Sequence, residues 1–126
     1  YKRPLSSMTP TIVMKNDEFF FTTGSPGGSR IISAVLQSIL NIIDFDMDLE
    51  QTNNARRIHH QWQPDVLQIE FSVEDSIKDK LLSLNYNGQV IEAATCLQTI
   101  MYKDGTYFGY GDFRRPDAFA SGDIND

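Results

Sequence analysis

The sequence has little of what disulfide-stapled, nucleic-acid-binding or membrane-spanning proteins need. Its single cysteine, Cys96, rules out an internal disulfide. Lys and Arg number 11 against 17 Asp and Glu, giving a formal net charge of −6. The basic residues are scattered, with doublets only at Arg56–Arg57 and Arg114–Arg115. Because phosphate backbones bind clustered positive charge, no nucleic-acid partner is expected. The longest apolar stretch, residues 31–43, contains polar residues and is shorter than the roughly 20 residues of a membrane span.

What is present is the composition of an ordinary globular chain. Hydrophobic residues make up 40% and charged residues 22% of the 126 residues, enough for one domain with a buried core. The chain opens on YKRPLSSM, without an initiator methionine or a signal-peptide pattern. We therefore expect it to be the later part of a longer protein.

Strand-like and helix-like segments alternate along the chain. Two hairpins are expected, one from residues 11–15 and 19–22 and one from residues 97–102 and 106–110. Apolar residues at helical spacing predict a helix of about four turns from Ser29. Apolar residues on a second side predict that this helix is covered on more than one side. The remaining expected elements are a helix from Asp48 to about Arg57, a strand at 66–71, a helix after Ser72 up to Asn85 and a strand at 90–94. Because the hairpins make part of the sheet antiparallel, the predicted fold class is α+β.

The glycine-rich segment TGSPGGSR, residues 23–30, is the first candidate site. It lacks the lysine of a phosphate-binding P-loop and the spacing of a dinucleotide fingerprint. It nearly fits a nucleophile elbow with Ser25 as nucleophile, but the next residue is Pro26. Proline has no N–H, so it cannot supply the oxyanion-hole donor that this motif requires.

Two glycines and two serines can each be interpreted in two ways, as part of a binding site or as a simple turn. Gly27 and Gly28 place adjacent N–H groups at a helix entry, which suits an oxyanion hole, but a simple glycine turn explains the same pattern. Ser6 and Ser7 could offer hydroxyls to a carboxylate or form a solvated turn. The local pattern decides neither case.

No metal or cofactor site is predicted. Asp44, Asp46 and Asp48 have the spacing of a calcium loop, but its glycine and its final glutamate are missing, so Asp48 is read as a helix cap. His59–His60 has no Cys or carboxylate partner at ligand spacing and is read as structural. Trp62 is read as a core or interface aromatic.

Several segments, taken in order, resemble the small subunit of bacterial γ-glutamyltranspeptidase. These segments are RPLSSM with TPTIV, then TGSPGGSR, then RIHHQW. The later stretch QTIMYKDGTYFGYGDFRR resembles that family's closing hairpin and the segment after it. The resemblance covers essentially the whole chain, so residues 1–126 are expected to be the C-terminal portion of that subunit.

The resemblance implies a fold and a reaction. The fold is part of the four-layer αββα architecture of N-terminal nucleophile (Ntn) hydrolases. In this family a precursor cleaves itself, and the freed N-terminal threonine attacks the γ-glutamyl amide of glutathione and related compounds. The γ-glutamyl-enzyme then passes its acyl group to water or to an amino-acid or peptide acceptor. By resemblance, Ser6 and Ser7 hold the substrate α-carboxylate, and Gly27 and Gly28 form the oxyanion hole.

The resemblance also implies what this chain does not contain. The nucleophilic threonine lies upstream of Tyr1, so the expected partners are the large subunit and the remaining N-terminal part of the small subunit. Residues 1–126 alone should then be inactive and should expose apolar surface. A periplasmic or secreted location and the absence of a cofactor are likewise implied by the family.

Two other interpretations remain. The same fold could serve a related Ntn acylase, such as a cephalosporin acylase or a capsule transpeptidase. Alternatively, the chain could be a non-catalytic amino-acid-binding or interaction domain.

Overall fold

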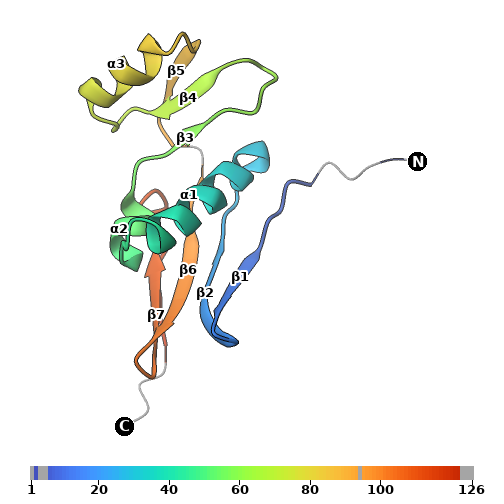
Figure 1. The fold of residues 1–126 in the computed structure, drawn as a ribbon, viewed down its shortest axis with the longest axis vertical. Helices are drawn as coiled ribbons and strands as arrows, with labels where there is room; N and C mark the ends of the chain where they lie inside the picture. The colour runs from blue at the N-terminus through green and yellow to red at the C-terminus, as the bar shows by residue number, and fades with distance from the viewer. Residues whose placement is uncertain (1, 3–5, 94, 123–126) are drawn as a thin grey trace.

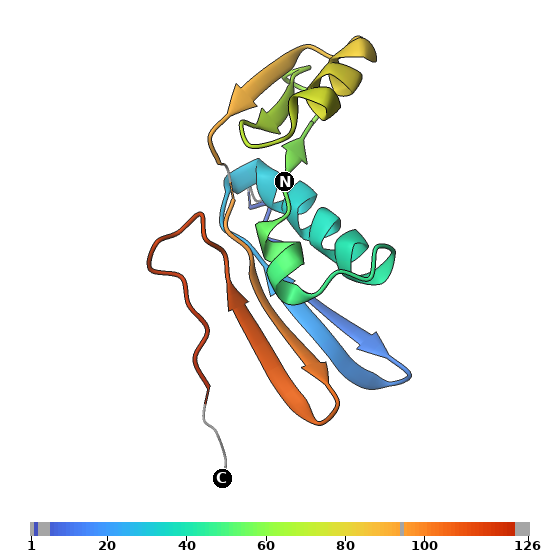
Figure 2. The same ribbon diagram turned by 90° about the vertical axis from the view of Figure 1, so that its left-hand side faces the viewer.

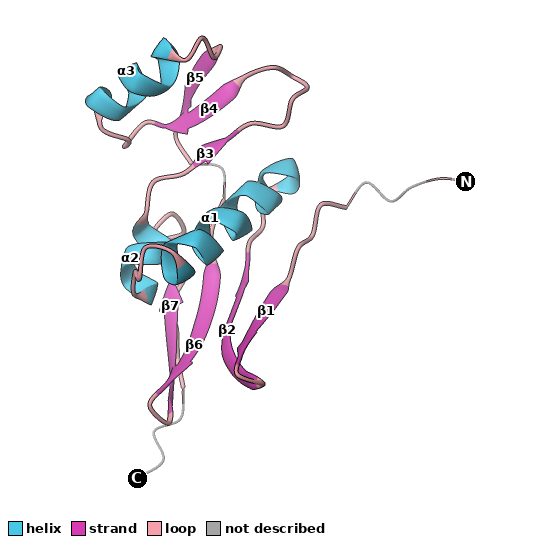
Figure 3. Ribbon diagram, in the orientation of Figure 1, coloured by secondary structure: helices cyan, strands magenta, loops and turns pink. Residues whose placement is uncertain are grey.

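The structure, a computed structural model, describes residue 2 and residues 6–93 and 95–122. The first three residues of RPLSSM and the last residue of the strand expected at 90–94 lie outside the described residues. The chain contains both helices and strands, and the strands form two separate sheets, as Figure 3 shows.

The larger sheet has four antiparallel strands in the order β1-β2-β6-β7. These strands are β1 (Thr11–Lys15), β2 (Glu18–Gly24), β6 (Gln98–Lys103) and β7 (Thr106–Gly111). Each hairpin closes through two residues with positive φ, Asn16 (54°) with Asp17 (65°) and Asp104 (50°) with Gly105 (84°). Such turns match the twist of paired strands and favour Asn, Asp and Gly. Both predicted hairpins are confirmed.

Two helices, α1 (Ile31–Ile43) and α2 (Leu49–Asn54), cover one face of this sheet (Figures 1 and 2). Phe21 of β2, Ile42 of α1 and Leu49 of α2 form a buried apolar cluster between the layers. Asp48 caps α2 as predicted, since its carboxylate accepts from the Gln51 N–H at 2.7 Å.

The smaller sheet has three strands in the order β3-β4-β5. These are β3 (Ile58–His59), β4 (Leu67–Glu70) and β5 (Gly88–Ile91), and the helix α3 (Asp75–Ser83) connects β4 to β5. β4 pairs antiparallel with β3 and parallel with β5. Leu67, Ile69 and Val73 form its buried cluster.

Some predicted boundaries are wrong, and tertiary contacts explain the differences. α2 ends at Asn54 rather than near Arg57, because Ala55 has extended backbone with ψ of 141° and leads into β3. The strand expected at 90–94 begins at Gly88, because parallel pairing with β4 sets its position. α3 begins at Asp75 and ends at Ser83, so it is shorter at both ends than the helix expected between Ser72 and Asn85.

One stripe of α1 has no covering partner among the described residues. Ile32 is 54%, Leu36 54% and Ile43 53% exposed, whereas Ala34, two residues from Ile32, is buried. The covering expected on a second apolar side is therefore not provided by this part of the chain. Within the described residues, no helix is both long and apolar enough to cross a membrane.

Candidate active site

The segment TGSPGGSR forms the junction between β2 and α1. β2 ends at Gly24, and a single 3-10 turn, η1 (Gly28–Arg30), leads directly into α1. Gly27 has φ of 140° and Gly28 has φ of 60°, which side chains disfavour. The Arg30 N–H closes the turn by donating to the Gly27 carbonyl at 3.2 Å. No acceptor among the described residues takes a hydrogen bond from the N–H of Gly27 or Gly28. The loop therefore presents two adjacent backbone donors at a helix entry.

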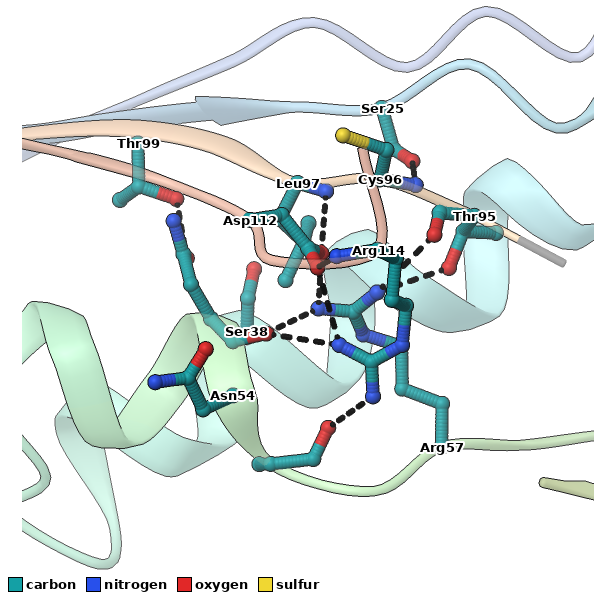
Figure 4. Close-up of polar contacts among 12 residues, drawn as sticks. Ser25, Ser38, Asn54, Arg57, Thr95, Cys96, Leu97, Thr99, Asp112 and Arg114 are labelled. Carbon is teal, nitrogen blue, oxygen red and sulfur yellow. Dashed lines mark hydrogen bonds and ion pairs between the residues drawn. The ribbon is translucent and has the colours of Figure 1, made fainter. Parts of the chain in front are cut away.

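Ser25 is held within the chain by two hydrogen bonds. Its hydroxyl donates to the Pro26 carbonyl at 2.7 Å and accepts from the Cys96 N–H at 3.1 Å, a contact visible in Figure 4. Among the described residues, no histidine or carboxylate hydrogen-bonds to this hydroxyl. Since a serine nucleophile needs an adjacent base, Ser25 acts here as an anchor between the glycine loop and the segment before β6.

A cavity of about 240 Å³ opens beside this loop. Gly27, Thr95, Cys96 and Arg115 contribute to its lining. Burial raises the pKa of the Cys96 thiol, which favours the neutral form. Gly27 of the glycine loop and the cationic Arg115 thus border the same cavity.

Ser6 and Ser7 lie in the segment that precedes β1. Ser6 is exposed and its hydroxyl accepts from the Met8 N–H at 3.3 Å, while Ser7 is half-buried. No hydrogen bond among the described residues joins either serine to Gly27 or Gly28. However, Thr11 of β1 pairs with Thr23 of β2, so the serine segment and the glycine loop leave neighbouring strands at the same end of the sheet.

Asp112, directly after β7, is the centre of a buried ion network that the sequence did not predict (Figure 4). Its Oδ2 accepts from Arg57 Nη2 at 2.7 Å and from the Leu97 N–H at 2.8 Å. Its Oδ1 accepts from the Arg114 N–H at 3.0 Å and from Arg114 Nη1 at 3.1 Å. Burial opposes ionisation, but the Arg57 charge and these N–H groups hold the pKa of Asp112 below its usual value.

Glu70, at the end of β4, forms an ion pair with Arg114 and accepts a hydrogen bond from the backbone of Arg57. Its Oε1 accepts from Arg114 Nε at 2.8 Å, and its Oε2 accepts from Arg114 Nη2 at 2.5 Å and from the Arg57 N–H at 3.0 Å. Arg57 Nη1 also donates to Thr95 Oγ1 at 3.1 Å, beside the cavity. This Arg57–Asp112–Arg114–Glu70 network is neutral overall and ties both sheets together next to the glycine loop.

One signal in the sequence could have revealed this network. Glu70 interrupts the apolar strand LQIEF, and a carboxylate there is buried only if it is paired. The arginine doublets supply the charges, but which arginine of each doublet turns inward depends on the fold. Arg57 is 6% exposed, whereas its neighbour Arg56 is exposed.

The two histidines of the HHQW segment make structural contacts, as expected, whereas Trp62 does not lie in the core. His59 is buried and hydrogen-bonds through both ring nitrogens, and His60 Nε2 lies 3.0 Å from Asp65 Oδ1. Trp62 is 74% exposed, so the interpretation as a core aromatic is wrong. A role at an interface stays a prediction.

The chain is similar to known proteins in both sequence and structure. The family model described as gamma-glutamyltranspeptidase matches residues 1–122. The glutathione hydrolase proenzyme of Escherichia coli (strain K12) is 45% identical over 125 residues, which cover 96% of this chain and 21% of that protein. The chain spans about a fifth of the length of the curated relatives it matches.

Solved structures agree with the sequence comparison. A Helicobacter pylori gamma-glutamyltranspeptidase mutant superposes with a TM-score of 0.83 at 43% identity, covering 90% of this chain and 64% of that chain. A cephalosporin acylase from Bacillus halodurans superposes with a TM-score of 0.82 at 22% identity, covering 93% of this chain and 22% of that chain. At that identity the acylase shows a shared fold only. The predicted α+β class, as part of an Ntn hydrolase fold, is confirmed.

Proposed function

This chain belongs to the gamma-glutamyltranspeptidase family, and we propose that residues 1–126 are the C-terminal portion of the small, catalytic subunit of a γ-glutamyltransferase or glutathione hydrolase. The named relatives support the substrate class, since the E. coli protein is called a glutathione hydrolase proenzyme. The word proenzyme also supports a precursor that cleaves itself. The large subunit, the N-terminal part of the small subunit and a periplasmic or secreted location belong to this proposal.

The observation that carries the proposal is the pair of N–H donors at Gly27 and Gly28. An N-terminal threonine outside this chain attacks the γ-glutamyl carbonyl, and the carbonyl oxygen becomes an oxyanion. Donors placed before the reaction stabilise this charge without reorganising. When the tetrahedral intermediate collapses, the amine leaves and a γ-glutamyl ester to the threonine remains. Attack by water or by an acceptor amine forms a second oxyanion at the same donors and releases the threonine.

Ser6 and Ser7 take the other end of the substrate in this proposal. Their hydroxyls donate to the α-carboxylate of the γ-glutamyl group, as charge-assisted hydrogen bonds. Support comes from their position before β1, at the end of the sheet where the glycine loop also emerges. Among the described residues, the hydroxyl of Ser6 has one contact, from the Met8 N–H at 3.3 Å, and we propose that it also binds the ligand.

The Ntn acylases and a non-catalytic binding domain are the competing functions. Hydrolysis of L-γ-glutamyl-p-nitroanilide by the full-length protein separates them, because the acyl group on this substrate must be γ-glutamyl. Absence of turnover with retained glutamate binding would favour the binding domain. Turnover of an acyl amide without a γ-glutamyl group, and not of this substrate, would favour another acylase.

Matched variants at Gly28 test the oxyanion assignment. Nothing lies within 4 Å of a Cβ at Gly28, so Gly28→Ala keeps the N–H at the cost of a strained φ. Gly28→Pro removes the N–H and, because the proline ring fixes φ at about −65°, also forces the backbone at this position to rearrange. We expect Gly28→Pro to lower the acylation rate by about 10²–10³-fold beyond Gly28→Ala, with glutamate binding retained. Equal rates in two folded variants would refute the assignment.

A further inference from the structure

One stripe of α1 joins the smaller sheet through hydrogen bonds. Arg30, the last residue of η1, and Ser33 and Gln37 of α1 are spaced three and four residues apart, so they share one face of the continuous helix. The contacts are Arg30 Nε to Gln68 Oε1 at 2.6 Å, Ser33 Oγ to His59 Nδ1 at 2.8 Å, and Gln37 Nε2 to the Ile58 carbonyl at 2.8 Å. We call these three contacts the α1 seam.

His59 is the central acceptor of the α1 seam and is 8% exposed. In the neutral ring, the orientation of the Gln61 amide selects the tautomer, because Gln61 Nε2 donates to the Gln63 carbonyl at 2.8 Å. Gln61 Oε1 therefore faces His59 Nε2, at 3.0 Å, and accepts its proton in the neutral ring. His59 Nδ1 is then the unprotonated nitrogen, and the Ser33 hydroxyl donates to it.

The glycine loop depends on anchors outside itself. Gly27 and Gly28 have no side chains, and the loop is tied upstream by the Ser25–Cys96 hydrogen bond. Downstream, the first contact of the α1 seam comes from Arg30, two residues after Gly28, and the second from Ser33, one turn later. Because a helix moves as a rigid unit, a shift of its first turn carries the adjacent donors with it.

We propose that His59, acting through Ser33, is a positioning residue for the backbone donors Gly27 and Gly28. This inference rests on the proposed function, since it concerns the same oxyanion hole. Oxyanion donors work within a narrow range of distances, about 2.7–3.1 Å from the developing charge. A displacement of about 1 Å can cost about 10²-fold in rate. Because the donors act in the transition state, the loss falls on kcat and not on KM.

Ser33→Ala in the full-length enzyme is the first test, with Ser38→Ala as the matched control. Ser38 lies on the same helix, but its hydroxyl donates to the Val35 carbonyl at 2.8 Å and lies 3.3 Å from Thr23 Oγ1 of the larger sheet. Each variant removes one buried or half-buried hydroxyl and should lower the thermal midpoint to a similar extent. We expect Ser33→Ala to lower kcat for L-γ-glutamyl-p-nitroanilide roughly 10-fold at unchanged KM, and Ser38→Ala to leave kcat within about twofold.

His59 variants provide a rescue test that does not depend on Ser33. His59→Ala removes the acceptor, whereas the amide oxygen of His59→Asn can accept from the Ser33 hydroxyl. We expect kcat to fall in His59→Ala and to recover most of its loss in His59→Asn. If His59→Ala does not fold, the kcat values of Ser33→Ala and His59→Asn still test the positioning role of His59.

Three results distinguish a failure of the proposed function from a failure of the positioning role. A wild-type enzyme that does not turn over the substrate overturns the proposed function. An active wild type in which Ser33→Ala and Ser38→Ala have the same kcat overturns the positioning role alone. A Ser33→Ala variant whose loss appears in KM also overturns it, because the α1 seam would then act on substrate binding.

Discussion

Arg57 Nη2 and Asp112 Oδ2 lie 2.7 Å apart, and their side chains are 6% and 0% exposed. The pair joins the segment after α2 to the end of β7, and Arg114 and Glu70 complete it into a neutral network. Burying one charge alone is costly, so each member of the network depends on the others. Arg114 of this network also lines the cavity at the glycine loop, and the contribution of the network to stability can be measured directly.

Asp112→Asn should destabilise the full-length protein strongly. The substitution keeps the size of the side chain but leaves two buried guanidinium groups with one carboxylate, at a cost of about 3–5 kcal/mol. Urea unfolding of the purified protein measures the loss. Asp117→Asn, at an exposed position in the same C-terminal segment, should change the free energy of unfolding by about 0.5 kcal/mol or less. A similar effect of the two substitutions would contradict the importance of the network.

Asp112 should also contribute to acid unfolding. Its pKa in the folded protein lies below the usual value of 3.8, so the native state binds this proton less readily than the unfolded state does. Its stabilisation is therefore present above about pH 4 and is lost as the pH falls through the folded pKa. Unfolding free energies from pH 7 to pH 2 should fall below pH 4 in the wild type. Asp112→Asn should show a smaller fall, because the asparagine side chain does not bind a proton in this pH range.

Gly111→Ala should displace the segment that follows β7. Figure 2 shows this segment turning back alongside β7, and a Cβ on Gly111 would lie 2.4 Å from the Ala118 carbonyl oxygen. Because the obstacle is backbone, the segment must move, at a cost of about 1–3 kcal/mol. Gly122→Ala is the control, since nothing lies within 4 Å of a Cβ there. Faster limited proteolysis after residue 112 in Gly111→Ala, and not in the control, is the expected result.

The exposed stripe of α1 should be an interface with the rest of the proposed enzyme. Ile32, Leu36 and Ile43 are each more than half exposed, which leaves apolar surface open to water. We expect residues 1–126 alone to be inactive and to bind the dye ANS, and we expect dye binding to fall when the remaining segments are supplied. Leu36→Glu should weaken that association, while Ser76→Glu, on exposed α3, should not. Catalysis by residues 1–126 alone would refute the absence of the nucleophile from this chain.

Local sequence determined much of this fold, because its signals act over a few residues. Asn16–Asp17 and Asp104–Gly105 predicted the two hairpins, since their backbones accept positive φ at little cost. Asp48 predicted the start of α2 through its capping hydrogen bond. The adjacent N–H groups of Gly27 and Gly28 and the missing N–H of Pro26 are also properties of the chain itself, but the local pattern left open whether the glycines form an oxyanion hole or a simple turn.

Tertiary structure alone decided the remaining features, because they join residues far apart in sequence. Nothing local distinguishes Arg57 from Arg56, yet only Arg57 is buried, since its guanidinium pairs with Asp112. The contact of Ser33 with His59 likewise required α1 to pack against β3. The spacing of TGSPGGSR determined which backbone groups the loop offers. The anchors at Cys96, Gln68 and His59, which determine where those groups lie, came only from the folded chain.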